Sequence, residues 1–406
     1  MNTHTTSRSQ PPAIAPAQAT VAGYLLTRLA EAGVVSVFGV PGDDNLALLD
    51  AVTARPSLAW IGTATEQGAG YAADGYARLR GLGAVVTTFG AGELSALDAI
   101  AGAYAESVPV VHIVGTPALA ARNPGSTFHH TLPGVGFGHF ATMAAQVTAA
   151  QADLRPDTAP AEIDRVLSTA LRSSRPVYLA VPADVAGASV PAPVGRLAPS
   201  ASRTVPSAVP SGPLIRQSLW NSVQEFLLPG DLIVADQGTA FHGAAGLRLP
   251  DGAQLIGQPP WGSPGWTLPA ALGACLAAPD RRLILIIGDV ALRHTAPELG
   301  TLLGQGVAPV IVVLDHDGYP VERVSCHPSA EYHDIPAWDW TALPAAVAPG
   351  ASTVTLRASR ADELARALVA AGHHADAGRP VVIEAVLGAE DIPPPLRDLS
   401  RALAHR

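Results

Sequence analysis

Two short apolar runs with polar ends, at residues 283–287 and 310–314, constrain the fold most strongly. Five consecutive aliphatic residues are typical of a strand buried on both faces of a parallel sheet. A helical segment lies between the runs, so both strands are expected to end at the same sheet edge. Asp289 follows the first run and residues 315–317 (Asp-His-Asp) follow the second. We therefore expect these side chains to converge on one site, where oxygen ligands suit a hard cation carrying phosphates.

The rest of the chain alternates strand and helix patterns, which predicts two α/β units with mainly parallel, doubly wound sheets. Strands are predicted in the first unit at residues 35–40, 60–63, 84–89, 108–114 and 176–181, and in the second at 232–235, 283–287, 310–314 and 381–386. Helices are predicted at residues 20–32, 46–53, 66–80 and 95–104. Residues 187–212 are rich in Pro, Ser and Ala, a composition typical of a linker. The expected organisation is a disordered leader at 1–19, domains at 20–186 and 213–395, a linker at 187–212 and a tail at 396–406.

Composition excludes several classes of function. The net charge is −9 and the basic residues form no cluster along the chain, which argues against nucleic-acid binding. No apolar run reaches the roughly 18 residues that span a membrane, and the start lacks the pattern of a signal peptide. Two cysteines give no disulfide framework, so a cytoplasmic location is expected. All 25 basic residues are Arg, so neither a Schiff-base lysine nor a Walker lysine exists.

Four motifs occur in order in the first half of the chain: GVPGDDNL at 39–46, TE at 65–66 with GYAADGYAR at 70–78, TFGAGELSAL at 88–97, and HHTL at 129–132. Together they resemble the motifs of thiamine-diphosphate-dependent 2-keto acid decarboxylases, in the pyruvate and indolepyruvate decarboxylase branch. In the second half, Asp289 lies 27 residues before His316, and GYPVE follows at 318–322. This spacing resembles the metal and diphosphate motif of the same family.

The resemblance implies a thiamine diphosphate cofactor and the decarboxylation of a 2-keto acid to an aldehyde. Glu66 would exchange a proton with the cofactor's aminopyrimidine ring. The other acids and bases would be Asp43, His129, His130 and Glu322. Outside its motif, a glutamate at a helix N-terminus is more often a partner of the helix dipole than a catalyst, and an aspartate after Pro-Gly is often a turn residue.

The resemblance also implies the residues that hold the cofactor. Metal ligands would be Asp289, His316 and Gly318, with Mg²⁺ or another divalent metal bound. Contacts with the cofactor would come from Gly238, Thr239, Gly262, Ser263, Pro264, Asp289, Val290, Ala291 and Tyr319. Val290-Ala291 replace the family's Gly-Ser, Asp315-His316 replace its Asn-Asn, and Pro264 replaces a bulky apolar residue. A histidine nitrogen suits zinc and other transition metals better than magnesium, and Val290 would be strained if the family's Gly adopts a positive φ.

Two hypotheses follow. The first is an active decarboxylase or carboligase with an altered metal site, acting on an aromatic or branched-chain 2-keto acid. This substrate class is implied by the likeness of residues 325–328, 332–335 and 338–340 to the indolepyruvate and branched-chain keto-acid decarboxylases. The second is a divergent homologue that is now a pseudoenzyme or partner protein, or that uses another cofactor. Relatives carry a third domain where this chain has the linker, and their cofactor lies between two subunits, so a homodimer is expected.

Overall fold

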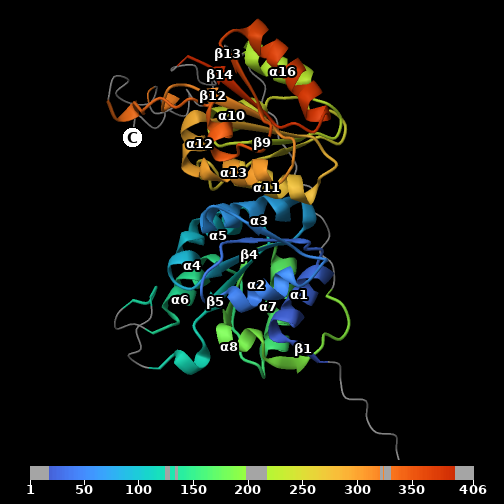
Figure 1. The fold of residues 1–406 in the computed structure, drawn as a ribbon, viewed down its shortest axis with the longest axis vertical. Coiled ribbons are helices and arrows are strands. Elements are labelled where there is room, and N and C mark those ends of the chain that lie inside the picture. The colour runs from blue at the N-terminus through green and yellow to red at the C-terminus, as the bar shows by residue number, and fades with distance from the viewer. Residues whose placement is uncertain are drawn as a thin grey trace, which may run out of the picture.

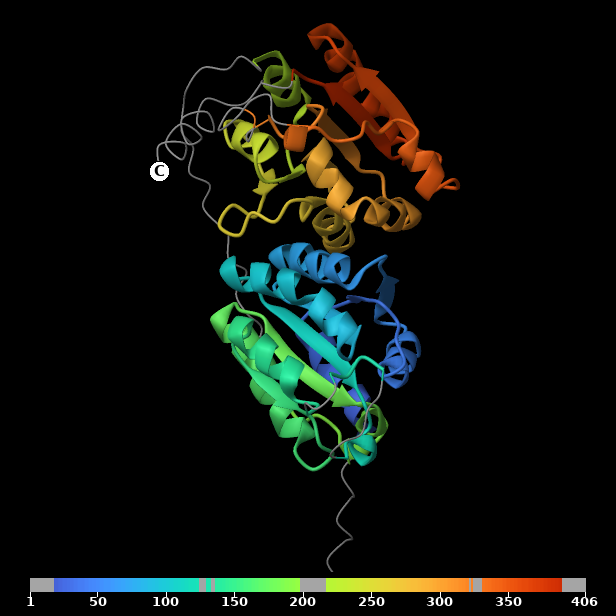
Figure 2. The same cartoon turned by 90° about the vertical axis from the view of Figure 1, so that its left-hand side faces the viewer.

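The computed structural model describes residues 18–123, 129–132, 136–197, 217–320, 323 and 331–388. In this part of the chain, each half contains a six-stranded parallel sheet, and helices lie on both sides of each sheet (Figure 1, Figure 2). The predicted fold class, two doubly wound parallel-sheet domains, is confirmed.

The first sheet has the strand order β3-β2-β4-β5-β7-β6. Its strands are β2 (Ser36–Gly39), β3 (Ala59–Gly62), β4 (Gly83–Thr88), β5 (Val110–Thr116), β6 (Gln151–Asp153) and β7 (Val177–Pro182). The helices of this domain are α1 (Val21–Glu31), α2 (Leu46–Thr53), α3 (Glu66–Arg80), α4 (Ala91–Ser95), α5 (Leu97–Ala105), α6 (His139–Ala144), α7 (Ala159–Ser173) and α8 (Ala183–Ala186), with 3₁₀ turns η1 (Leu119–Ala121) and η2 (Ala145–Val147). Strands β2, β4, β5 and β7 are buried along their whole length. Their sequences are therefore mostly apolar and do not alternate between apolar and polar residues.

The second sheet has the order β10-β9-β11-β12-β14-β13. Its strands are β9 (Leu232–Ala235), β10 (Gln254–Ile256), β11 (Leu283–Gly288), β12 (Val310–Asp315), β13 (Val354–Ala358) and β14 (Val381–Val386). The helices are α9 (Gln217–Phe226), α10 (Thr239–Ala244), α11 (Thr267–Ala277), α12 (Asp289–Thr295), α13 (Pro297–Gly304), α15 (Leu343–Val347) and α16 (Ala361–Asp376), with a 3₁₀ turn η3 (Glu331–His333). Strands β11 and β12 pair in parallel with Gly288 opposite Leu314, so their carboxyl ends lie side by side as predicted.

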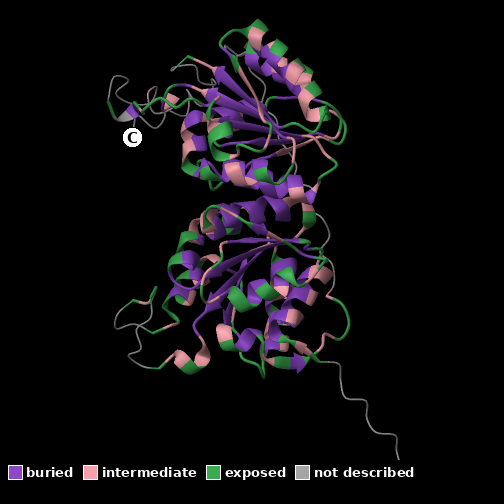
Figure 3. Ribbon diagram, viewed as in Figure 1, coloured by how far each residue is buried: buried purple, intermediate pink, exposed green. Residues whose placement is uncertain are grey.

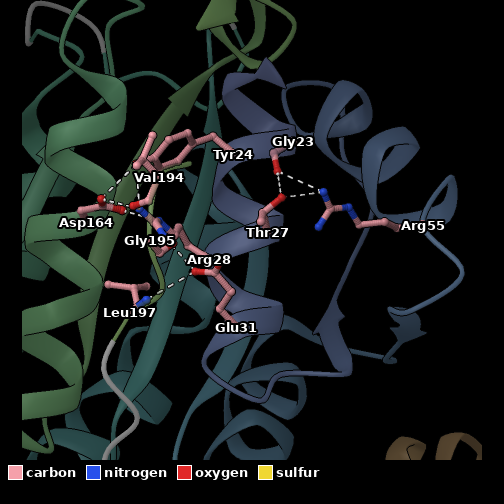
Figure 4. Close-up of polar contacts among 10 residues, drawn as sticks. All are labelled: Gly23, Tyr24, Thr27, Arg28, Glu31, Arg55, Asp164, Val194, Gly195 and Leu197. Carbon is pink, nitrogen blue, oxygen red and sulfur yellow. Dashed lines mark hydrogen bonds and ion pairs between the residues drawn. The ribbon is translucent and has the colours of Figure 1, made fainter. Parts of the chain in front are cut away.

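The first part of the predicted linker belongs to the first domain. Strand β8 (Ser189–Pro191) pairs antiparallel with β1 (Gln18–Thr20). Residues 194–197 are then held by Arg28, whose buried guanidinium donates to the carbonyls of Val194 (3.3 Å) and Gly195 (2.8 Å) (Figure 4). Asp164 supplies the compensating charge at 2.8 Å from Arg28 Nε. A linker prediction based on composition misses this anchoring, because it comes from backbone contacts and from two isolated apolar side chains, Val190 and Leu197, that pack on the core of the first domain.

The two domains pack through helices α3 and α11, which lie between the two sheets (Figure 1, Figure 3). Two glycines allow this close approach: a Cβ at Gly75 would collide with the backbone of Ala270, and one at Gly273 with the backbone of Ala72. One continuous hydrophobic cluster extends from Phe38 in the first sheet, through both helices, to residues of the second sheet. The domains therefore share a core.

Candidate active site

Three of the predicted catalytic residues lie together at the surface of the first domain. Nε2 of His129 is 3.2 Å from Oδ2 of Asp43, and the rings of His129 and His130 are 4.4 Å apart between centroids. The Asp43 and His129 side chains are 78% and 58% exposed, so their ion pair stabilises the fold little. His130 has a φ of 67°, which is uncommon for a residue other than glycine. A backbone held in this conformation is often found at functional sites.

A glycine turn places this cluster next to Glu66. Gly90 has a φ of 68°, and a Cβ there would collide with the carbonyl oxygen of His130. A Cβ at Gly92 would lie 3.1 Å from Oε1 of Glu66. The turn therefore fills the space between His130 and Glu66, and a residue with a side chain would push them apart.

Glu93 holds this turn, although the sequence did not identify it as important. Its Oε1 accepts the N–H of Gly90 at 2.9 Å, and its Oε2 accepts the hydroxyl of Tyr178 at 2.7 Å. Burial raises the pKa of Glu93 above its ordinary value, and the two donors partly offset this. The signal that could have found it is a glutamate three residues after a turn glycine, the spacing of a capping interaction.

Glu66 is the first residue of α3, and its helix begins with two caps. The hydroxyl of Thr65 accepts the N–H of Gly68 at 3.0 Å. Glu298, from the second domain, accepts the N–H groups of Ala64 (3.2 Å) and Thr65 (2.9 Å). Glu298 is almost completely buried, and no local pattern marks it, because its partners are 233 and 234 residues away along the chain. Glu66 is thus fixed relative to both domains.

The predicted pyrimidine-binding turn, residues 261–266, is held by Asp236. Oδ2 of Asp236 accepts the N–H of Gly265 at 3.1 Å and the hydroxyl of Thr267. Burial raises the pKa of Asp236 to about 6, and these hydrogen bonds oppose the shift. Gly262 and Gly265 have φ values of 69° and 82°, so the turn requires glycine at both positions. Gly262, Ser263 and Pro264 were predicted from the motif of this turn, whereas Asp236 lies outside that motif and was not predicted.

Asp289 lies at the carboxyl end of β11, opposite the end of β12. Its Oδ2 accepts the N–H of Gly318 at 3.1 Å, and the backbone N–H groups of Val290 and His316 also point to it. Burial is the main cause that raises the pKa of Asp289 to about 6, and the nearby Asp315 carboxylate adds to it. The backbone of His316 and the carboxylate of Asp315 thus lie close to Asp289, as the strand ends predicted, while their part in cofactor binding stays a prediction.

His316 is buried, and its Nδ1 lies 3.1 Å from the carbonyl oxygen of Leu314. A carbonyl oxygen can only accept, so Nδ1 donates in this contact, and Nε2 is the ring nitrogen through which a metal would bind. Among the described residues, no group of three or more His, Cys, Asp or Glu side chains is arranged to hold a metal ion. A metal here would need backbone or cofactor oxygens as well.

The departures at Val290, Pro264 and Ala291 lie at the start of α12 and on the turn that it contacts. Val290 lies inside α12 and is not among the described residues with a positive φ, so the expected strain does not occur. Pro264 is exposed on the turn. Ala291 is buried and packs against the turn, where its carbonyl oxygen would be 2.6 Å from a Cβ at Gly265.

The backbone around Asp289 leaves room for a ligand. A Cβ built on Gly288 or on Gly238, which has a φ of 91°, would find no heavy atom within 4 Å. Thr239 begins the helix that follows Gly238, and Tyr319, half-buried, follows Gly318. A buried carboxylate beside an open glycine backbone fits a metal and diphosphate. Glu322, with residues 324–330, lies outside the described part of the chain.

Comparisons with known proteins agree with this geometry. Residues 19–139 match the model described as "Thiamine pyrophosphate enzyme, N-terminal TPP binding domain", and residues 238–385 match the corresponding C-terminal TPP binding domain. The chain is similar to the alpha-keto-acid decarboxylase of Mycobacterium ulcerans, at 37% identity over 547 residues, covering 95% of this chain and 96% of the relative. The proteins of the same name from Mycolicibacterium paratuberculosis (36% over 544 residues, 94% and 96% covered) and Mycobacterium tuberculosis H37Rv (35% over 547, 95% and 97%) are also similar.

The chain therefore belongs to the family of thiamine-diphosphate-dependent enzymes, among the 2-keto acid decarboxylases. The alignment with the Mycobacterium ulcerans protein is 547 positions long, which exceeds the 406 residues of this chain by 141. The relatives thus contain residues without a counterpart here. Among the described helices, none combines the length and apolar character needed to cross a bilayer.

Proposed function

We propose that this protein binds thiamine diphosphate and uses it to decarboxylate a small 2-keto acid to an aldehyde. The observation that carries the proposal is the position of Glu66. Its helix begins at a cap supplied by Glu298 of the second domain, and the same helix contacts Ser263 of the pyrimidine-binding turn through Tyr71. Membership of the decarboxylase family supports the same reaction.

The second domain would hold the cofactor. We assign the divalent metal to Asp289, His316 and Gly318, with Mg²⁺ or a metal that accepts imidazole nitrogen. Gly238, Thr239, Gly262, Ser263, Pro264, Val290, Ala291 and Tyr319 would line the rest of the cofactor site. Once bound, the cofactor supplies an electron sink for the electrons left behind when carbon dioxide departs.

The first domain would supply the proton transfers. We assign the carboxylate of Glu66 to exchange a proton with the bound cofactor. Nε2 of His129 lies 3.2 Å from Oδ2 of Asp43, a contact that orients the ring, and the His130 ring lies beside it at a tilt. These residues, with Glu322, would give and remove protons on the substrate side. We assign no single proton to one of these residues.

The substrate class and assembly follow from the resemblance. We propose an aromatic or branched-chain 2-keto acid, with acyloin carboligation as a second product route, and we place the protein in the cytoplasm as a homodimer. The linker would replace the middle domain of relatives, and the 141-position excess of the alignment supports this. A divergent protein with weakened or lost cofactor binding, or with another cofactor, is the alternative. The departures at Val290, Ala291, His316 and Pro264 favour it.

The test is turnover of phenylpyruvate and 2-ketoisovalerate by wild type and by Glu66→Gln. We expect the substitution to lower kcat by roughly 100- to 10,000-fold, because the amide cannot exchange the required proton. Glu225→Gln, which changes an exposed glutamate on α9, is the matched control and should leave kcat unchanged. Undiminished turnover in Glu66→Gln would show that the mechanism is wrong, and no turnover in wild type would favour the alternative.

A further inference from the structure

We propose that Glu93 and Tyr178 are positioning residues for the reaction. Together they fix the glycine turn at residues 90–92 and, through it, the separation of His130 from Glu66. This assignment rests on the proposed function, because it concerns residues to which the proton transfers are assigned. Every contact that carries it lies within the first domain, so it is independent of how that domain meets a second domain, in the same chain or in another.

The turn separates two residues that the proposed mechanism needs at a fixed distance. A Cβ built on Gly90 would collide with the carbonyl oxygen of His130. On the other side of the turn, a Cβ at Gly92 would lie 3.1 Å from Oε1 of Glu66. The backbone of the turn is thus in close contact with both residues, so a shift of the turn would displace them. Misplacing a reacting group by about 1 Å can lower a rate by on the order of 100-fold.

Glu93 connects the turn to the sheet. Its side chain is buried, and its Oε1 accepts the N–H of Gly90 at 2.9 Å. Tyr178 donates its hydroxyl hydrogen to the other carboxylate oxygen, Oε2, at 2.7 Å. A buried carboxylate oxygen that lacks a donor is costly, so the position of the Glu93 carboxylate depends on both donors. The hydrogen bond that holds the turn is therefore coupled to the hydroxyl of Tyr178.

The sheet sets the position of the Tyr178 hydroxyl. Tyr178 lies in β7 and pairs with His112 of β5, and the two rings meet edge to face with their centroids 5.6 Å apart. Nε2 of His112 lies 2.9 Å from Oγ1 of Thr87, and burial lowers the pKa of His112 to about 3. The ring is therefore neutral and does not compete for the carboxylate of Glu93. Ala144 of α6 belongs to the apolar cluster around Tyr178.

The residue before the turn is fixed by packing. Phe89 is buried, and its ring meets that of Phe140 edge to face, with the centroids 5.2 Å apart. At the next residue, Gly90, the backbone has a φ of 68° and no side chain that could pack. Its hydrogen bond to Glu93 is therefore the contact that holds the turn beyond Phe89.

The first measurement needs no cofactor. In Glu93→Ala and Tyr178→Phe the Gly90 amide should exchange with deuterium about tenfold faster than in wild type, because its acceptor is lost or weakened. Glu93→Gln keeps an oxygen for this N–H and should exchange at the wild-type rate. Tyr24→Phe is the matched control. Tyr24 is also buried and donates to a carboxylate, that of Asp164 at 2.9 Å, but it contacts α7 rather than the turn (Figure 4).

The second measurement is turnover of a 2-keto acid. We expect kcat to fall by about 10- to 100-fold in Glu93→Ala and by less in Tyr178→Phe. Cofactor affinity should stay within about threefold of wild type, because the cofactor contacts are assigned to the second domain. Glu93→Gln should restore kcat to within about threefold of wild type, and Tyr24→Phe should leave it unchanged. The double variant Glu93→Ala/Tyr178→Phe should lose no more than Glu93→Ala, since both residues act through one carboxylate.

Unchanged exchange of the Gly90 amide in Glu93→Ala would overturn the inference, whether or not the protein is a decarboxylase. Where wild type is active, a wild-type kcat in Glu93→Ala, or a loss in Glu93→Gln as large as in Glu93→Ala, would contradict it as well. If wild type turns over no keto acid, the proposed function fails, but the position of His130 can still be followed by NMR of protein labelled with [15N]histidine. Its ring resonances should shift in Glu93→Ala and not in Tyr24→Phe, and constant resonances would refute the positioning role.

Discussion

At the scale of single residues, buried carboxylates determine the shape of the site. Asp236 is 1% exposed and anchors the turn that carries Gly262 and Ser263. Water cannot stabilise its charge there, so burial raises its pKa from 3.8 to about 6. The folded protein therefore holds a proton on Asp236 at a pH where the unfolded chain has released it.

The free energy of unfolding should depend on pH because of this proton. Between about pH 4 and pH 6 the folded state binds more protons than the unfolded state, so this residue's contribution to the free energy of unfolding falls as pH rises, by roughly 3 kcal/mol for two pKa units. Asp236→Asn cannot titrate. We expect its free energy of unfolding, relative to wild type, to increase by that amount across the interval, measured by urea denaturation at each pH.

The exposed carboxylate Asp251 provides the control for this experiment. The free energy of unfolding of Asp251→Asn should change with pH as that of wild type does. If the free energies of unfolding of wild type and Asp236→Asn change with pH in parallel, Asp236 is already ionised in the folded protein. Its role in holding the turn would then depend on charge rather than on a neutral hydrogen-bonded carboxyl group.

Which site residues the sequence could reveal depends on how far their partners lie along the chain. Asp289 and Gly318 were predictable because strand ends and motif spacing place them at one sheet edge. Asp43 and His129 were predicted from their motifs, and the structure brings them to 3.2 Å. Glu298 and Asp236 were not predicted, because their interactions cross domains or connect loops, and local patterns contain no information about such contacts.

At the scale of elements, strong apolar runs were predicted, and so was the edge strand β3, but the other three edge strands, β6, β10 and β13, were not. Strands β4, β11, β12 and β14 were located within one or two residues. The edge strands β6 and β10 have only three residues each, too few for alternation to be visible. β13, also at an edge, is mostly half-buried, so its pattern is weak. Such strands form because a neighbouring strand offers free hydrogen-bonding groups.

The crossing of α3 and α11 is the element contact on which the site depends most. Gly273→Ala would place a methyl group against the backbone of Ala72, which cannot move without shifting α3. We expect the free energy of unfolding to fall by about 1–3 kcal/mol, as for other overpacked cores. Chemical denaturation, followed by tryptophan fluorescence, measures this.

Gly304→Ala is the matched control at the end of α13, because a Cβ there meets no atom within 4 Å. It should change stability by less than about 0.5 kcal/mol. Equal stability of the two variants would show that α3 and α11 do not pack as closely as the structure indicates.

At the scale of the whole molecule, the chain keeps the two cofactor domains of its family and joins them through a common core. The alternation of strands and helices predicted both domains. It could not predict how they pack, because that arrangement depends on glycines and buried polar groups whose importance appears only when both surfaces are known. The fold thereby packs helix α3, which begins at Glu66, against the turn that carries Ser263.

The most direct test of a working cofactor site is calorimetric titration with thiamine diphosphate, first with Mg²⁺ and then with Mn²⁺. We predict saturable binding of one cofactor per chain to wild type. Affinity should fall at least about tenfold in Asp289→Asn, which removes the charged metal ligand. Asp317→Asn, at an exposed neighbouring position, should bind as wild type does. No binding to wild type with either metal, or equal affinity in Asp289→Asn, would contradict the assignment of the site.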